Sequence, residues 1–385
     1  MEIIYIMDCF DEVETEEVHD GYFYNVGEVI KIIILGSLCG LKNVKRIHQW
    51  AASDRVSEFL KEKFGIERVP CYYWMLCLLK IVKPESLNDC FRRWVSGFMP
   101  AYEDGGENQE RKNLTVSVDG KSVRSTGKMK KYEGKALHIV SAQLAELGLT
   151  FAQEAVDSKS NEIPAVQALL KELDVRGCLV TADAMNCQIK TAETILESKG
   201  DYLLCAKGNH EKTREAVEFH IRNEKNKDKI NRAESHESNR GRDETRTAYV
   251  IPFSVLKQEK LCDEDWPKLA CIGAIHRKIE TNGKETDEWR HYISSRELTA
   301  EELLHAVRME WTVETMHWLL DVRFDEDRCR AENKNVQRNL NTLRKLSLNL
   351  IRLFKQRTQS KKAFSHIMLD CLLEPDLLIR VISEN

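Results

Sequence analysis

The sequence has 385 residues, of which 42% are hydrophobic and 31% charged, and its formal net charge is −4. This balance is typical of a soluble globular protein of one to three domains, and it excludes a fibrous repeat, a disordered chain and a membrane bundle. The slightly acidic charge also argues against nucleic acid as a partner, because nucleic-acid-binding domains are usually basic. That argument holds only if charge is spread evenly along the chain.

Charge is in fact distributed unevenly. The first 20 residues hold eight acidic residues and no Lys or Arg. Two other segments are basic: residues 111–135 hold eight Lys or Arg and two acids, and residues 328–362 hold eleven Lys or Arg and one acid. Basic segments favour contacts with phosphate groups, which weaken as salt rises, although a solvated helix face is the alternative for residues 328–362.

Cysteine usage and the N-terminus indicate the compartment. The 12 cysteines include no Cys-x-x-Cys pair, which argues against a zinc ribbon or a thioredoxin-like motif. Scattered cysteines in a long chain are typical of the reducing cytosol. The acidic N-terminus lacks the basic segment of a signal peptide, and the apolar stretch Val29–Leu41 contains Lys31 and is too short to span a membrane. We therefore expect a cytoplasmic protein that does not bind membranes.

The first part of the chain is predicted to be helical. Apolar positions recur at three- and four-residue spacing in segments of the region 26–98. A polar, Gly-containing segment, Pro100–Asn113, follows and is typical of a linker. We therefore place a domain boundary near residue 105, between a helical N-terminal domain, 1–105, and a second domain, 106–385.

The second domain begins with alternating strands and helices. Strands are predicted at 114–118, 136–144, 149–156, 178–182 and 202–206, and helices at 163–173 and 188–198. This order argues for an α/β layer with a mixed sheet. Residues 211–247 are very polar and begin as a helix. Further strands are expected at 248–251, 270–275 and 289–294, and helices from residue 299 onward.

Two aspartates directly follow predicted strands. Asp119 comes after the first strand, and Asp183 comes after the fourth. By itself, Asp119 is explained better as a turn residue before Gly120, and Asp183 as an N-terminal helix residue favoured by the helix dipole. Together, two carboxylates at the ends of neighbouring strands indicate a metal site, because Mg²⁺ prefers oxygen ligands and takes one or two carboxylates besides substrate phosphates.

A third group of ionisable residues lies in the long C-terminal helical region. Glu310, Glu314, His317 and Asp321 share one helix face. A solvated stripe is one explanation, but Glu310 and Glu314 repel each other at this spacing unless a cation lies nearby. The Glu-x-x-His spacing of Glu314 and His317 also occurs in di-iron bundles, which need four long helices that the strand-rich middle of this chain does not supply.

Polar clusters follow some of the predicted strands. They comprise Lys159–Ile163, Lys207–His210 and Gly241–Arg246. Ordinary loop composition explains each cluster alone. Beside the two aspartates, their cations and amides are suited to contact phosphate groups in a cleft.

Eight short motifs occur in a fixed order along the chain. Three of them contain the candidate acids: Ser117-Val-Asp-Gly-Lys-Ser-Val-Arg, Thr181-Ala-Asp-Ala-Met-x-Cys-Gln and Trp311-x-Val-Glu-x-x-His-Trp. The other five lie at 137–142, 159–165, 201–209, 241–246 and 292–295. Over residues 11–355 they closely resemble the bacterial insertion-sequence transposases that include the H-repeat-associated proteins. The helical N-terminal segment resembles the transposase-associated domain of that family.

The resemblance implies a DDE transposase with a ribonuclease-H-like core: a mixed sheet flanked by helices, a strand-rich insertion at about 211–295 and a separate helical N-terminal domain. It assigns Asp119, Asp183 and Glu314 as the acids that bind two Mg²⁺ ions, which Mn²⁺ can replace. In such sites the ions lie about 3.5–4 Å apart and clamp the scissile phosphate. The implied reaction cleaves DNA at the transposon ends and joins their 3′-hydroxyl groups to target DNA.

The implied partner is DNA, at both terminal inverted repeats and target, bound by a homodimer near the bacterial nucleoid. Residues in or near the motifs are candidates for DNA contacts: Lys121, Arg124, Lys159, Asn161, Lys207, Asn209, Arg242 and Arg308. The chain departs from the family pattern near the third acid, with Glu310 in place of His. All three acids are present, which argues against one alternative, a catalytically silent DNA-binding derivative. The other alternative is a metal-dependent nuclease that cuts without strand transfer.

Overall fold

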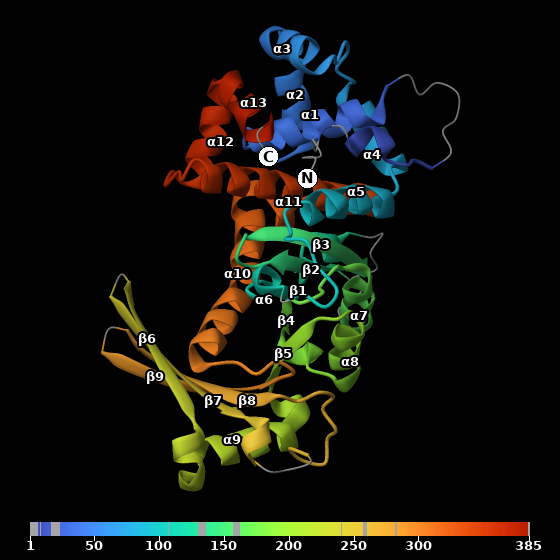
Figure 1. Ribbon diagram of the computed structural model, residues 1–385. Helices are drawn as coiled ribbons and strands as arrows, with labels where there is room; N and C mark the ends of the chain where they lie inside the picture. The colour runs from blue at the N-terminus through green and yellow to red at the C-terminus, as the bar shows by residue number, and fades with distance from the viewer. Residues whose placement is uncertain are drawn as a thin grey trace.

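One large mixed sheet organises the fold. The computed structural model describes residues 7, 9–16, 24–106, 108–129, 136–156, 162–239, 241–256, 260–281 and 283–383. Nine strands in these ranges form a single sheet in the order β3-β2-β1-β4-β5-β9-β8-β7-β6. Figure 1 shows a layer of helices above the β3 edge and the strands β6 to β9 at the other end. The predicted α/β class with a mixed sheet is confirmed.

The first five strands form the half of the sheet that carries the candidate aspartates. Their bounds are β1 Thr115–Val123, β2 Leu137–Leu144, β3 Leu149–Val156, β4 Leu179–Ala182 and β5 Asp201–Ala206. β1, β2 and β3 pair antiparallel, whereas β4 pairs parallel with both β1 and β5. The crossover helices α7, Glu162–Glu172, and α8, Ile189–Glu197, pack against each other and against these strands. Every residue of β2 and β4 is buried, as expected for strands covered on both faces.

Strands β6 to β9 extend the sheet beyond β5 as an antiparallel meander. Their bounds are β6 Asn231–Asn239, β7 Arg242–Pro252, β8 Cys271–Thr281 and β9 Lys284–Ser294. The helix expected at residue 211 is α9, Glu211–Arg222, which packs against β8 and β9. The predictions found only the apolar halves of β7, β8 and β9, and they missed β6 entirely. The strand segments that the predictions missed are polar and mostly exposed. They are strands because their backbones pair with neighbouring strands, and not because they have an apolar face.

Most helices from both ends of the chain pack together beside the β3 edge of the sheet. The helices before the sheet are α1 Val26–Leu38, α2 Val44–Ala51, α3 Asp54–Phe64, α4 Tyr72–Ile81, α5 Pro84–Ser96 and α6 Gln109–Lys112. Those after it are α10 Ala300–Phe324, α11 Lys334–Arg357, α12 Phe364–Leu373 and α13 Pro375–Ser383. α11 packs against α1, α4, α5 and β3, and Figure 1 shows it lying between α1, α12 and α13 on one side and the sheet on the other. No helix in the described ranges is both long and apolar enough to cross a bilayer.

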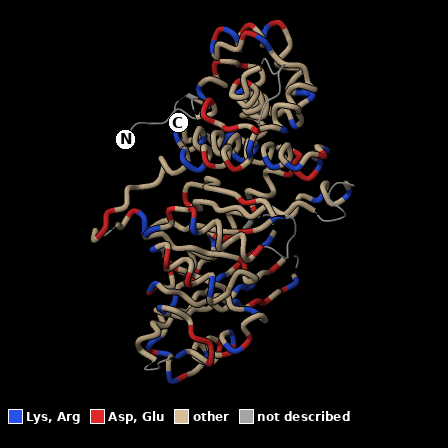
Figure 2. Tube along the Cα trace, turned by 90° about the vertical axis from the view of Figure 1, so that its right-hand side faces the viewer, with Lys and Arg blue, Asp and Glu red and all other residues tan. Residues whose placement is uncertain are grey.

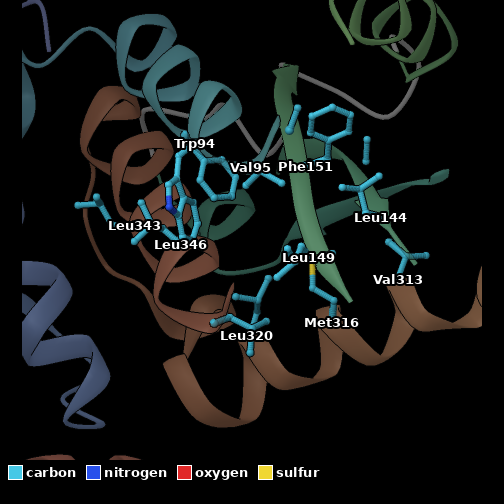
Figure 3. Packing of buried hydrophobic residues seen from close by; sticks show 14 of the residues in the cluster. Trp94, Val95, Leu144, Leu149, Phe151, Val313, Met316, Leu320, Leu343 and Leu346 are labelled. Carbon is cyan, nitrogen blue, oxygen red and sulfur yellow. The ribbon is translucent and has the colours of Figure 1, made fainter. Parts of the chain in front are cut away.

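A continuous apolar core joins this helical layer to the sheet. Figure 3 shows Trp94 of α5 near Leu343 and Leu346 of α11, and Leu149 of β3 near Met316 of α10. Each of these side chains is at most 2% exposed, and burying one large apolar side chain stabilises a fold by about 1.5–3 kcal/mol. The core therefore fixes α10 against the sheet, which is where the third candidate acid lies.

Helix α11 corrects the interpretation of the basic segment 328–362. Residues 339–351 are all buried. Lys345 is 2% exposed and donates hydrogen bonds to Ser141 Oγ at 2.7 Å and to Gln153 Oε1 at 2.6 Å. Both the phosphate contacts and the solvated helix face are therefore wrong for the middle of this segment. The polar partners that allow this burial lie on β2 and β3, far away in sequence.

Candidate active site

The parallel ladder between β1 and β4 places two aspartates at adjacent positions. Its last register pair joins Val118 of β1 to Ala182 of β4. Asp119 and Asp183 are the next residues of the two strands. Because parallel strands run in the same direction, both carboxylates lie at the same edge of this ladder.

Only one of the two aspartates ends its strand as predicted. Asp183 does so, and its side chain accepts a hydrogen bond from the backbone N–H of Ala184 at 2.6 Å. β1 instead continues to Val123, because β2 pairs with it beyond the end of β4, with Asp119 opposite Ser141. The strand-end prediction and the alternative of an Asp-Gly turn are therefore both wrong for Asp119.

Helix α10 brings the third acid to this edge. A capping box between Thr299 and Glu302 fixes the first turn of the helix, and the helix packs against β1 and β4. Glu310 and Glu314, one turn apart, line the same cavity as the aspartates. The shared helix face predicted for these two residues is confirmed.

One cavity of about 150 Å³ joins the candidate acids. Asp119 and Asp183 line it from the sheet, and Glu310 and Glu314 line it from α10. The complete lining is Val118, Asp119, Asp183, Ala184, Cys205, Lys207, Arg290, Glu310, Trp311, Val313 and Glu314. The structure thus brings the three predicted acids together and adds Glu310 as a fourth.

The carboxylates in this cavity repel one another. Burial raises the pKa of Asp119 to about 7, and the negative charges of Asp183, Glu162 and Glu314 contribute to that rise. Burial likewise raises the pKa of Glu310 to about 7, against the opposing charge of Arg290. A cation in the cavity would offset this repulsion and favour the ionised forms.

Residues of α10 and of the turn after it contact Asp119 and Lys121 of β1. His317 Nδ1 lies 3.5 Å from Asp119 Oδ2. Burial lowers the pKa of His317 to about 3, so this imidazole is neutral and does not compensate the charge of Asp119. Lys121 donates hydrogen bonds to Asp321, and to Glu326 at 2.6 Å, so its charge is compensated within the chain.

The other candidates for DNA contacts lie in different surroundings. Lys207 is exposed and lines the cavity. Asn209 donates hydrogen bonds to the carbonyl groups of Ala184 and Cys187, at 2.9 and 3.4 Å, and so supports the loop after Asp183. Lys159 and Asn161 lie outside the described residues.

Three candidate arginines form ion pairs. Their partners are Asp327 for Arg124, Glu244 for Arg242 and Glu237 for Arg308. Figure 2 shows Lys and Arg interspersed with Asp and Glu along both the helical layer and the sheet. A role of these arginines in DNA binding stays a prediction.

Sequence reasoning missed how the outer strands contribute to the cavity. The guanidinium carbons of Arg277 and Arg290, on β8 and β9, lie 5.1 and 5.2 Å from the ring centre of Trp311 on α10. Arg290 also lines the cavity. The sequence indicated a strand in the apolar half of β9. It did not show that this strand pairs with β5, which places Arg290 beside the cavity.

The donor set suits a hard divalent cation, because carboxylate oxygens are the ligands that Mg²⁺ prefers. Within the described ranges, however, no three His, Cys, Asp or Glu side chains are grouped closely enough to hold a metal ion as they stand. The cavity therefore presents carboxylates of the right chemical type, without a preformed set of three ligands in the described ranges.

The comparisons with known proteins identify the family. The sequence matches the Transposase DDE domain family over residues 110–350 and the DDE_Tnp_1-associated family over residues 7–95. The chain belongs to the DDE transposase family. As predicted from its motifs, it is an insertion-sequence transposase of the group that includes the H-repeat-associated proteins.

Several relatives of this transposase come from Escherichia coli. "Putative protein YbfL" of strain K12 is 31% identical over 338 residues, 85% of each chain. "H repeat-associated putative transposase YhhI" of the same strain is 29% identical over the same shares. "Putative transposase YncI" of O157:H7 is 36% identical over 62% of this chain and 61% of the relative. Among solved structures, a piggyBac transposase synaptic complex with hairpin DNA has a TM-score of 0.39 and 12% identity, over 99% of this chain and 77% of the other.

Proposed function

We propose that the cavity between β1, β4 and α10 is the active site of this transposase. Asp119, Asp183 and Glu314 would hold two Mg²⁺ ions there, which Mn²⁺ can replace. The observation that carries this proposal is that three carboxylates far apart in sequence line one cavity. When bound, such ions activate the attacking hydroxyl group and stabilise the charge on the leaving oxygen.

The residues of the chain position the reaction. Paired strands and a hydrogen-bonded loop fix the backbone at Asp119 and Asp183, so only side-chain adjustment would be required when a cation binds. Glu314 approaches from a helix that the core fixes against the sheet. Lys207 and Arg290 line the same cavity and present positive charge to the phosphates of a DNA strand.

The proposed substrate is DNA: the terminal inverted repeats of the element, which are cut, and a target, to which the 3′-hydroxyl ends are joined. Pairing two ends calls for a homodimer. We assign β3-β2-β1-β4-β5 to a ribonuclease-H-like core and residues 211–295, with α9 and β6 to β9, to an insertion between the second and third acids. Residues 1–105 form the helical N-terminal domain of this scheme, and the enzyme acts at the bacterial nucleoid in the cytoplasm.

A cleavage assay on duplexes that carry the element's terminal repeats tests this function. With Mg²⁺, the wild type should release ends with free 3′-hydroxyl groups and join them to a second duplex. Asp183→Ala and Glu314→Gln should lose both activities, whereas Glu301→Gln, a matched change at an exposed site of the same helix, should retain them. Cleavage without joining would identify a nuclease. Absent Mg²⁺-dependent cleavage by the wild type, or equal cleavage by Glu314→Gln, contradicts the proposal.

A further inference from the structure

A buried polar cluster lies under β1, on the face away from α10. His138 Nε2 lies 2.7 Å from Glu162 Oε2, and Asn186 Nδ2 donates a hydrogen bond to Glu162 Oε1 at 3.0 Å. Ser122 Oγ lies 3.0 Å from the other ring nitrogen of His138. His138, Glu162 and Asn186 are 1%, 2% and 0% exposed. Both oxygens of the Glu162 carboxylate are therefore engaged inside the protein.

The cluster contacts the strand that carries Asp119. A Cβ atom at Gly120 would lie 2.4 Å from His138 Nε2 and 2.5 Å from Glu162 Oε2. Real Cβ atoms do not approach other atoms so closely, so only glycine allows β1 to lie this near the cluster. Successive residues of a strand point to opposite faces, so Gly120 rests on the cluster while Asp119 faces α10.

The cluster also holds the loop that carries Asp183. Asn186 ends the short 3-10 helix that begins after Asp183, and its backbone N–H donates to the carbonyl oxygen of Asp183 at 2.8 Å. The side chain of the same Asn186 donates to Glu162. Glu162 is thus connected to both aspartates, through Gly120 on one side and Asn186 on the other.

We propose that Glu162 is a positioning residue that holds Asp119 and Asp183 at the spacing required for cation binding. This inference rests on the proposed function, because it takes the two aspartates as metal ligands. Glu162 is outside the described lining of the cavity, so it acts through hydrogen bonds and packing rather than by contact with substrate. The proposal also gives a role to the motifs at 137–142 and 159–165, which the active site itself does not use.

Mn²⁺ binding measured without DNA, by calorimetry and by electron paramagnetic resonance of free Mn²⁺, tests the role. Glu162→Ala removes both connections and should weaken Mn²⁺ affinity about 10- to 100-fold, the loss found when partners of metal ligands are removed. Glu162→Gln should bind Mn²⁺ nearly as well as wild type. The new amide oxygen accepts the hydrogen bond from Asn186, and the new NH₂ group donates to His138 Nε2 when the imidazole carries its proton on Nδ1. A group that acted by its charge would fail equally as Gln and as Ala.

The matched control is Gln167→Ala. Gln167 also lies on α7 and donates to Thr191 Oγ1 of α8 at 3.2 Å, a hydrogen bond that involves neither Gly120 nor the loop after Asp183. This variant should keep wild-type Mn²⁺ affinity. If Glu162→Ala does not fold, Asn186→Ala cuts only the branch to Asp183 and should still weaken Mn²⁺ binding.

Unchanged Mn²⁺ affinity in Glu162→Ala would overturn the positioning role, and so would unchanged affinity in Asn186→Ala if Glu162→Ala does not fold. A Gln variant as impaired as the Ala variant would also overturn it, as would a wild type that binds no Mn²⁺. Failure of the proposed function is distinct, because it appears as a wild type that cleaves no DNA, whatever its Mn²⁺ affinity.

Discussion

Asp119 and Asp183 occupy equivalent positions in two parallel strands, each one residue beyond the register pair of Val118 and Ala182. Their different surroundings follow from the neighbours of those strands. Asp119 remains in a paired strand and is half-buried, whereas Asp183 follows the end of its strand and is exposed. The cavity is therefore lined by one half-buried and one exposed aspartate.

Binding of Mn²⁺ is expected to strengthen as pH rises through 7. Burial raises the pKa of Asp119 to about 7, so at lower pH a proton must leave this carboxyl group before a cation can bind. Thermal denaturation with and without Mn²⁺ at pH 6 and pH 8 measures the effect as a larger rise in Tm at pH 8. Asp119→Asn should lose most of that rise. Equal shifts at the two pH values would contradict the prediction.

Without metal, the Asp119 carboxyl group should destabilise the protein at high pH. Its folded-state pKa, about 7, lies above the unfolded value of about 3.9. The folded chain therefore binds more protons between these values, and this stabilising contribution is lost as pH rises through 7. Asp119→Asn should raise the free energy of unfolding at pH 8 by on the order of 1–2 kcal/mol in urea denaturation. Asp228→Asn, at an exposed site, is the control and should change little; a less stable Asp119→Asn would refute the argument.

Gly120→Ala should destabilise the fold by about 1–3 kcal/mol, the usual cost of overpacking a core. The added methyl group would overlap the buried pair of His138 and Glu162. Gly208→Ala provides the comparison, because a Cβ at Gly208 has no described atom within 4 Å, and its effect should stay within about 0.5 kcal/mol. Chemical denaturation of both variants measures the difference, and equal stabilities would show that β1 can move away from the cluster.

The centre of the fold could be predicted from the sequence, and the outer strands could not. Strands β1 to β5 and their crossover helices have apolar residues at the spacing that burial requires, so local pattern and tertiary packing agree. β6 has the sequence Asn-Arg-Ala-Glu-Ser-His-Glu-Ser-Asn and is stabilised by pairing with β7. The continuation of β1 past Asp119 depends in the same way on the register of β2. Pairing partners distant in sequence leave no local periodicity to read.

The three candidate acids were predictable from motifs, but the charges around them were not. Lys207 was predicted, and it lies in the cavity lining. Lys121 and Lys345 lie in basic segments whose composition favours phosphate contacts. Both side chains nevertheless bind polar partners inside the fold. Whether a charged residue is buried depends on such long-range partners, and a single sequence does not reveal them.

Lys207→Ala should weaken DNA binding through the loss of one phosphate contact. Lys207 is exposed at the cavity, and loss of one cation should reduce the slope of log K against log salt concentration by about 0.9. Fluorescence anisotropy with a terminal-repeat duplex at several salt concentrations measures both quantities. Lys212→Ala removes an exposed lysine that pairs with Asp263 at 2.7 Å, and it should leave the slope unchanged. Identical slopes for wild type and Lys207→Ala would remove Lys207 from the DNA interface.

Lys345 should make the stability of the protein depend on pH above neutrality. Burial lowers the pKa of Lys345 to about 7, below the unfolded value of about 10.4. Between these values the unfolded chain binds a proton that the folded chain does not, so this group's contribution to the free energy of unfolding rises with pH and is lost as pH falls through 7.

Lys345→Met should remove this dependence, because Met has nearly the same length and no titratable group. In urea denaturation at pH 6.5, 8 and 9.5, the stability of the wild type relative to Lys345→Met should therefore increase with pH. Lys361→Met removes an exposed lysine of the same basic segment, and its difference from wild type should be the same at all three pH values. A constant difference for Lys345→Met would mean that the buried amine keeps the same charge throughout this range, held by Ser141 and Gln153.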